Sequence, residues 1–204
     1  VLDGYGVKIN GPVPTIFSQT NSESVNEINT EQVASALEKA GWKVGTDGTR
    51  SKTGTALAFS ISTADTPELV ATADIIKENL EAIGFMVEVK IYSLGDLNQD
   101  SIRPRDYEAL LFGEYVTDTG SLYAFWNSTQ AEDPGLNVAM YKSSIVDKAF
   151  SELFNATDAT RRHNALVAIE SDIEKNAPVA FLYSPLYLEA RRNEAEGQSK
   201  TTGI

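Results

Sequence analysis

The sequence predicts an α/β domain in which a mixed, mostly parallel sheet is flanked by helices. Apolar residues alternate along 55–63 and again along 85–92, which is the period of a β-strand. Residues 66–84 between them carry apolar side chains at the helical period. A strand, a helix and a second strand in this order form a βαβ unit, whose two strands lie parallel with a right-handed crossover.

Before this unit the chain is predicted to form an irregular arm and one helix. Residues 1–29 are rich in Gly, Pro, Ser and Asn, which is typical of irregular structure. Thr30 is a candidate N-cap and Glu31 suits the positive end of the helix dipole. The helix continues to Gly41, and its apolar face is predicted to consist of Val33, Ala36, Leu37 and Ala40.

The crossover helix has clear signals at both ends. Thr66 is the predicted N-cap, Pro67 takes the first helical position and Glu68 lies in the first turn. Gly84 ends the helix. The stripe expected to face the sheet consists of Leu69, Ala73, Ile76, Leu80 and Ile83.

The second half of the chain predicts two more strands and two helices. The strands are expected at 106–113 and 179–184, and the helices at 144–154 and about 158–176. The last residues, 193–204, form a polar tail. We expect one domain over the whole chain.

Composition excludes several classes of protein. The net charge of -12 disfavours nucleic acid and anionic membrane surfaces as partners. The absence of Cys excludes disulfides and thiolate metal sites, and a single His, His163, leaves no His-based metal cluster or catalytic triad. No phosphate-binding glycine motif is present, so we expect neither a metal nor a cofactor. Because the sequence begins at Val1 without a leader, we expect a piece of a longer protein.

The stretch LLFGEYVTDTGSLYAFWNST, residues 110–129, holds the candidate functional residues. It contains two acids, Glu114 and Asp118, followed or flanked by the aromatic residues Tyr115, Tyr123, Phe125 and Trp126. The stretch leaves the carboxyl end of the predicted strand 106–113, which is where ligands tend to bind in open α/β sheets.

Two catalytic interpretations of these acids are possible. Asp118-Thr119-Gly120 matches the active-site triplet of aspartic proteases, which need two such carboxylates in an all-β fold. Glu114 and Asp118 together could act as the acid and base of a glycoside hydrolase. The alternatives to catalysis are ordinary turn chemistry and an acid at a helix N-terminus.

A series of segments resembles one family. In order, these are LEAIGFMVEVKIYSLGDL, RDYEALLFGEY, Asp118, FWNSTQ, GLNVAMYKSSIVDKAF and APVAFLYSPLYL, and the match extends from about Gly4 to Leu188. They resemble the peptide- and nickel-type extracellular solute-binding proteins of ABC transporters, the group of the oligopeptide- and dipeptide-binding proteins.

The resemblance implies a type II periplasmic-binding-protein fold and a receptor that is not an enzyme. Residues 1–204 would be a single ligand-binding lobe, and the N-terminal lobe of the two-lobed receptor would be missing from it. The implied solute is a peptide, a nickel complex or a sugar, and the implied partners are the ABC permease subunits. The implied location is extracytoplasmic, in the periplasm or lipid-anchored at the cell surface.

The resemblance also implies a binding role for the acidic loop. Asp118 is the closest match to the family's carboxylate that pairs with a peptide α-ammonium, and Glu114 and Tyr115 would contact the solute near it. Tyr123, Trp126, Asn137 and Tyr141 complete the predicted site. For several of these a structural role is the alternative, because Phe125 and Trp126 could be core rings of a short helix beginning near Ser121, while Asn137 and Tyr141 could end a strand.

Overall fold

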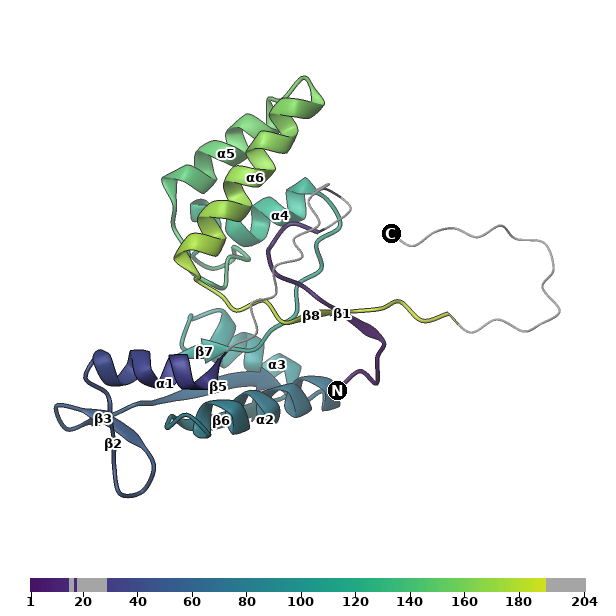
Figure 1. The fold of residues 1–204 in the computed structure, drawn as a ribbon. Coiled ribbons are helices and arrows are strands. Elements are labelled where there is room, and N and C mark those ends of the chain that lie inside the picture. Colours follow the sequence, from purple (N-terminus) through teal and green to yellow (C-terminus); the bar gives the residue numbers. More distant parts are fainter. Residues whose placement is uncertain (15–16, 18–28, 190–204) are drawn as a thin grey trace. The chain divides into compact units, whose positions relative to one another are not determined.

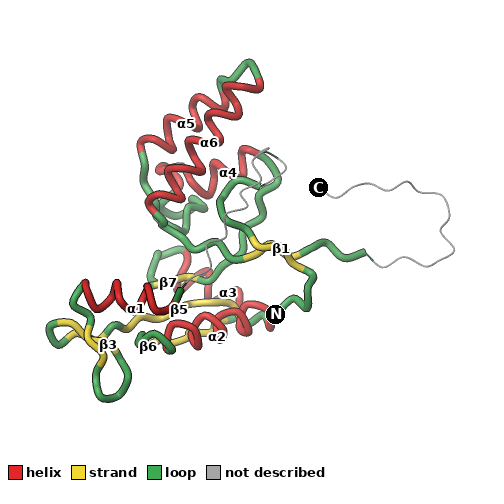
Figure 2. Tube along the Cα trace, viewed as in Figure 1, coloured by secondary structure: helices red, strands yellow, loops and turns green. Residues whose placement is uncertain are grey.

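A computed structural model describes residues 1–14, 17 and 29–189 of the chain (Figure 1). The chain divides into two compact units, one of Val1 with Ser24–Lys142 and the other of Leu2–Glu23 with Ser143–Ile204. The first unit contains two sheets and the second unit one, and each unit has helices of its own (Figure 2).

The first unit contains most of the strands. Its elements are α1 (Thr30–Lys39), β2 (Lys43–Val44), β3 (Arg50–Lys52), β4 (Thr55–Ala56), β5 (Ala58–Ala64), α2 (Pro67–Glu81), β6 (Met86–Tyr92), α3 (Leu94–Asp96), the π-helix η1 (Leu97–Ile102), β7 (Ala109–Leu110), α4 (Thr119–Trp126) and the 3-10 helix η2 (Ser128–Gln130). The second unit contains β1 (Gly6–Lys8), α5 (Ser144–Phe154), α6 (Ala159–Asn176) and β8 (Tyr183–Pro185).

The main sheet of the first unit has the order β6-β5-β7, and both pairings are parallel. Ile61 in the middle of β5 lies opposite Val89 of β6 and Ala109 of β7. The predicted βαβ unit is therefore confirmed, because β5 and β6 are parallel and α2 connects them. Helix α2 packs against both strands (Figure 1).

The ends and the inner face of α2 follow the sequence signals. Thr66 occupies the N-cap position ahead of Pro67, although its side chain makes no capping hydrogen bond. Ala73, in the predicted stripe, is fully buried, and the other four members of the stripe are half-buried. Burial of this stripe against β5 and β6 supplies the main apolar contact of the sheet's covered face.

Strand β7 is much shorter than the predicted strand 106–113. Only Ala109 and Leu110 pair with β5, because the Glu108 carboxylate accepts hydrogen bonds from the Ser60 backbone N–H at 2.8 Å and from its hydroxyl at 2.7 Å. A side chain thus occupies the place where the strand pairing would otherwise continue. These two bonds also lower the pKa of Glu108.

The region around α1 corrects two predictions. The N-cap of α1 is Asn29, whose side chain accepts from Glu31 N and Gln32 N, and Thr30 is the first helical residue. Asn is the stronger capping residue of the two. The predicted strand 55–63 is also divided, because Thr55–Ala56 forms β4 of a separate antiparallel sheet, β2-β3-β4, and β5 begins at Ala58.

A buried arginine ties this antiparallel sheet to two helix ends. Arg50 in β3 is 4% exposed, and its side chain donates to Ile83 O at 2.8 Å and to Trp42 O at 3.0 Å. Ile83 follows α2 and Trp42 follows α1, so one guanidinium satisfies carbonyls beyond both helices. Its backbone N–H donates to Gly84 O at 2.7 Å.

The second unit is a helical hairpin with a two-stranded ribbon. Helices α5 and α6 pack side by side (Figure 1), and the 144–154 and 158–176 predictions are confirmed to within a residue. β1 pairs antiparallel with β8, so the predicted irregular arm 1–29 contains a short strand. The predicted strand 179–184 is shifted to Tyr183–Pro185 because only the segment opposite β1 is paired. The predicted tail 193–204 lies outside the described residues.

None of the helices in the described part of the chain combines the length and the apolar character that crossing a bilayer requires.

Gly84 offers a test of the Arg50 junction. Its φ is +95°, and a Cβ there would lie 2.7 Å from Cγ of Arg50. Gly84→Ala should therefore carry both the cost of a left-handed backbone, about 1–2 kcal/mol, and a clash with a buried side chain. Gly54→Ala is the matched control, since Gly54 has φ +84° and open space around its Cβ position. Urea unfolding should show a larger loss in the free energy of unfolding for Gly84→Ala than for Gly54→Ala. Equal losses would contradict the close packing of Arg50 against Gly84.

Candidate functional site

The candidate site begins where the chain leaves β7. Leu111 N donates to Ser62 O at 2.9 Å, and Thr63 Oγ1 donates to Leu111 O at 3.1 Å, so the exit from the strand is held by β5. The chain then runs through Glu114 and Tyr115 to Asp118, which is the N-cap of α4. The expected position of the acidic loop after the strand is thus found in the structure.

Asp118 and Ser121 form a capping box. The Asp118 carboxylate accepts from Ser121 N at 2.7 Å, and the Ser121 hydroxyl receives the Asp118 N–H at 3.0 Å. The helix N-terminal role that the sequence left open is therefore present. The hydrogen bonds from the Ser121 backbone and hydroxyl lower the pKa of Asp118, so its exposed carboxylate is ionised at neutral pH.

Glu114 has the opposite electrostatic character. The residue is exposed to solvent as a whole, but loss of hydration around its carboxyl group raises its pKa to about 7. Near neutral pH this carboxyl group therefore exists in both protonation states. The two acids of the loop provide one fixed negative charge and one titrating group.

The aromatic residues divide into exposed and buried rings. Tyr115 is 86% exposed, whereas Trp126 is 2% exposed. Tyr123 and Phe125 are half-buried, and the Tyr123 hydroxyl lies 3.2 Å from Thr129 Oγ1. The core alternative therefore describes Trp126 in this structure, and Tyr115 is the most exposed of these four rings.

Asn137 is an internal strut. It is 0% exposed, and its Nδ2 donates to Asn127 O at 3.1 Å and to Tyr141 O at 2.8 Å. Its Oδ1 accepts from Tyr141 N at 3.2 Å. Because both ends of the amide are bonded to backbone, the side chain has no surface to offer a ligand here. The half-buried Tyr141 is held by this strut.

Two residues that the sequence did not single out, Arg105 and Tyr107, hold the backbone around Asn137. Arg105 donates from Nε to Ala131 O at 3.1 Å and from Nη2 to Gly135 O at 2.6 Å, and the Tyr107 hydroxyl donates to Val138 O. Burial raises the pKa of Tyr107, which keeps its hydroxyl a donor. The run RPRDY carries no local sign of these bonds, since their acceptors are distant backbone carbonyls.

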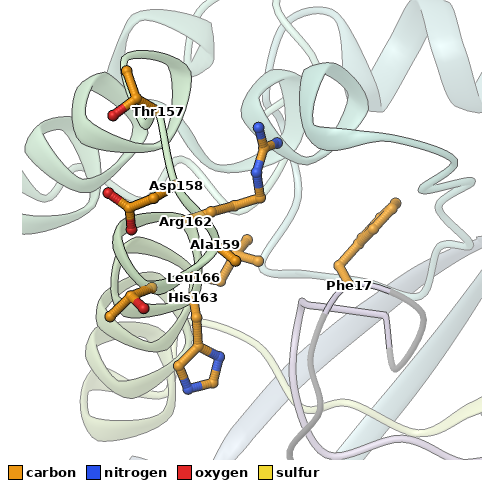
Figure 3. Close-up of a pocket in the computed structure, with 8 residues that line it drawn as sticks. Phe17, Thr157, Asp158, Ala159, Arg162, His163 and Leu166 are labelled. Atoms are coloured by element: carbon orange, nitrogen blue, oxygen red, sulfur yellow. The ribbon is translucent and has the colours of Figure 1, made fainter.

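A hollow lies in the second unit, at the start of α6 (Figure 3). Its lining includes Asp158, Arg162, His163, Leu166 and Phe17, and contains none of the predicted site residues. Arg162 and His163 extend in different directions, as neighbouring residues on a helix do (Figure 3). Because its polar groups do not converge, we do not regard the hollow as the functional site. In the described ranges, no group of three or more His, Asp or Glu is placed to hold a metal ion.

Comparison with known proteins identifies the family. The model of the bacterial extracellular solute-binding proteins, family 5 Middle, matches residues 1–135. The chain belongs to this family. Its members are binding proteins rather than enzymes, so the protease and glycosidase interpretations of Asp118 and Glu114 are set aside. A search of curated proteins finds no match.

Solved structures show the same fold. The chain is similar to NikZ from Campylobacter jejuni in complex with Ni(L-His), with 23% identity, a TM-score of 0.77 and coverage of 90% of this chain and 38% of NikZ. It is similar to the oligopeptide-binding protein AppA from Bacillus subtilis in complex with a nonapeptide, with 26% identity, a TM-score of 0.75 and the same two coverages.

A third similar structure is DppA from Helicobacter pylori in complex with the peptide STSA, with 22% identity, a TM-score of 0.67 and coverage of 90% of this chain and 34% of DppA. These neighbours confirm the α/β, type II periplasmic-binding-protein class of fold. The chain spans about 38% of the length of NikZ and of AppA.

The capping role of Asp118 can be tested by thermal unfolding. Asp118→Ala removes the acceptor for Ser121 N and should lower the melting temperature by roughly 2–4 °C. Asp118→Asn should leave it within about 1 °C, because Asn caps a helix as well as Asp does. Equal losses in the two variants would show that the charge, and not the cap, stabilises α4.

The raised pKa of Glu114 predicts a pH dependence of stability. Its pKa rises from 4.5 to about 7 on folding. The contribution of the protonated group to the stability of the fold is therefore full below pH 4.5 and is lost as the pH rises from there through 7. Gln has no charge to hydrate, so Glu114→Gln should stabilise the chain relative to wild type at pH 8 and much less at pH 5.

Melting temperatures of both proteins across this pH range give the measurement. Glu78→Gln, at an exposed position of α2, is the control, and its effect on the melting temperature should be the same at pH 5 and pH 8. A Glu114→Gln difference that is constant between pH 5 and pH 8 would contradict the assignment.

Proposed function

We propose that the chain is the ligand-binding lobe of a two-lobed extracytoplasmic receptor that captures oligopeptides for an ABC importer. The family match over residues 1–135 carries this proposal. Two similar structures support a peptide as the solute, since AppA is in complex with a nonapeptide and DppA with the peptide STSA. Capture by such a receptor follows from closure of two lobes, because only the closed state offers contacts from both.

The acidic loop supports recognition of a cationic group. Asp118 is exposed and its pKa is lowered, so a carboxylate is ready for a peptide α-ammonium. A charge-assisted hydrogen bond of this kind contributes about 1.5–3 kcal/mol. The exposed Tyr115, three residues before it in the chain, offers an apolar surface that tolerates varied side chains, and Glu114 adds a second acid. Tyr123 and Tyr141 remain proposed contacts at the margin of this surface.

Asp118→Asn separates the charge from the cap. In the complete receptor, this variant should keep the fold and lose affinity for peptides by about tenfold or more. The probe is a pool of random pentapeptides with free N-termini, compared with the same pool after N-acetylation. Native mass spectrometry should show that wild type retains the free pool, and that acetylation reduces binding about as much as the substitution does.

Three outcomes would decide against parts of the proposal. Unchanged affinity of Asp118→Asn removes Asp118 from the site. Equal retention of acetylated and free peptides excludes α-ammonium recognition. Retention of a nickel–histidine complex in place of any peptide keeps solute capture and overturns the oligopeptide assignment.

A further inference from the structure

We propose that Arg105 is a positioning residue of the solute site, whose guanidinium clamps the segment 128–141 and so fixes the exposed side chains which that segment presents to the solute. This inference rests on the proposed function. Arg105 acts through the backbone of this segment and does not have to touch the solute. The proposal also explains why Arg105 and Tyr107, in the RPRDY run, bond to distant backbone carbonyls.

The clamp consists of several bonds from one side chain. Arg105 donates to Ala131 O at 3.1 Å and to Gly135 O at 2.6 Å, and a third bond goes to Ile102 O beside it. Guanidinium is suited to this arrangement because its donors are planar and fixed relative to one another. Arg105 itself has a φ of +60°, an unfavourable conformation for a residue with a Cβ.

Further contacts fix the rest of the segment. A Cβ on Gly135 would lie 2.2 Å from Gln130 O, so two stretches of backbone approach each other more closely than any other residue allows. Tyr107 holds Val138 O, and Asn137 holds Asn127 and Tyr141. Each end of the segment and its middle are thus fixed by side-chain hydrogen bonds to the backbone.

The pinned segment displays two apolar side chains. Leu136 is 50% exposed and Met140 is 42% exposed, on either side of the fully buried Asn137. Met140 has a φ of +52°, which persists only where the surroundings determine the backbone. Methionine adapts to partners of varied shape, which suits a receptor for peptides of varied sequence.

The clamp matters for affinity because ordering costs free energy. A segment of this length that had to become ordered when the solute binds would subtract that cost from the affinity. Arg105 orders the segment before the solute binds, because it donates hydrogen bonds to backbone carbonyls that would otherwise be hydrogen-bonded to water. Loss of the clamp should therefore weaken binding without removing any contact to the solute.

Arg103 is the matched control. It is also an arginine that contacts the same segment, but it does so through a two-bond ion pair with Asp133. Nε lies 3.3 Å from Oδ1 and Nη2 lies 3.3 Å from Oδ2, and the two side chains are 60% and 37% exposed. Because both bonds are longer than the roughly 2.7–2.9 Å of a strong charge-assisted bond and the pair is exposed, it contributes little. Arg103→Gln removes a similar charge from the same run and leaves the carbonyl clamp in place.

The experiment uses the complete receptor and the pool of random pentapeptides. Arg105→Gln should lose affinity by about tenfold, while Arg103→Gln should stay within about twofold of wild type. Tyr107→Phe, which removes only the hydroxyl that donates to Val138 O, should lose affinity by several-fold and serves if Arg105→Gln folds poorly. Amide hydrogen exchange of the free receptor should rise in residues 128–141 of Arg105→Gln and stay unchanged in β5 and β6.

The outcomes separate this inference from the function on which it rests. Wild-type affinity in both Arg105→Gln and Tyr107→Phe overturns the positioning role. Faster exchange spread equally over the strands and the segment also overturns it, because the role would then be general stability. If wild type binds no peptide although the segment loosens in Arg105→Gln, the proposed function has failed and the clamp is without a solute to serve.

Discussion

The parallel pairing of β5 on both of its sides is the constraint on which the first unit depends. Parallel strands cannot be joined by a tight turn, so the chain must cross over between them, and α2 provides the crossover to β6. Because the strands run the same way, their carboxyl ends share one edge of the sheet. Thr63 and Ser62 at the end of β5 bond to Leu111 and fix the point from which the acidic loop departs. The loop's location is thus a consequence of strand pairing rather than of its own sequence.

The helix cap that Asp118 forms is compatible with its proposed role in ligand binding. Its bonds to Ser121 begin helix α4, and the same bonds stabilise the ionised form. A carboxylate that caps a helix in this way stays charged, which is the state that a cationic ligand group requires. The capping interpretation and the binding interpretation are therefore compatible, and the sequence alone had left them as alternatives. At Glu114, four residues earlier, loss of hydration raises the pKa instead.

The elements that the sequence predicted are those decided by local patterns. The 2-residue period of β5 and β6, the Pro67 start of α2 and the two long helices after Ser143 all have short-range signals. Strand β7 was predicted too long because its length is set by Glu108 meeting Ser60, 48 residues earlier in the chain. Asp118 and Tyr115 remain predicted site residues, chosen from residue type and position, and both are exposed between β7 and α4. The burial of Asn137 was not predicted, because an amide side chain gives no sign of whether tertiary contacts will enclose it, whereas the core alternative for Trp126, at the end of α4, agrees with its burial.

The segment 128–141 illustrates why such contacts escape a reading of the sequence. Its backbone carbonyls are bonded by Arg105, Tyr107 and Asn137, and carbonyls are present at every residue. The residue types of the segment therefore do not indicate which of its carbonyls accept these side-chain hydrogen bonds. What selects them is the close approach at Gly135, which only a glycine permits, and which brings the turn within reach of the guanidinium. A glycine and an arginine 30 residues apart act together here. The shape of this segment thus depends on tertiary hydrogen bonds and on one glycine, none of which a local sequence pattern reveals.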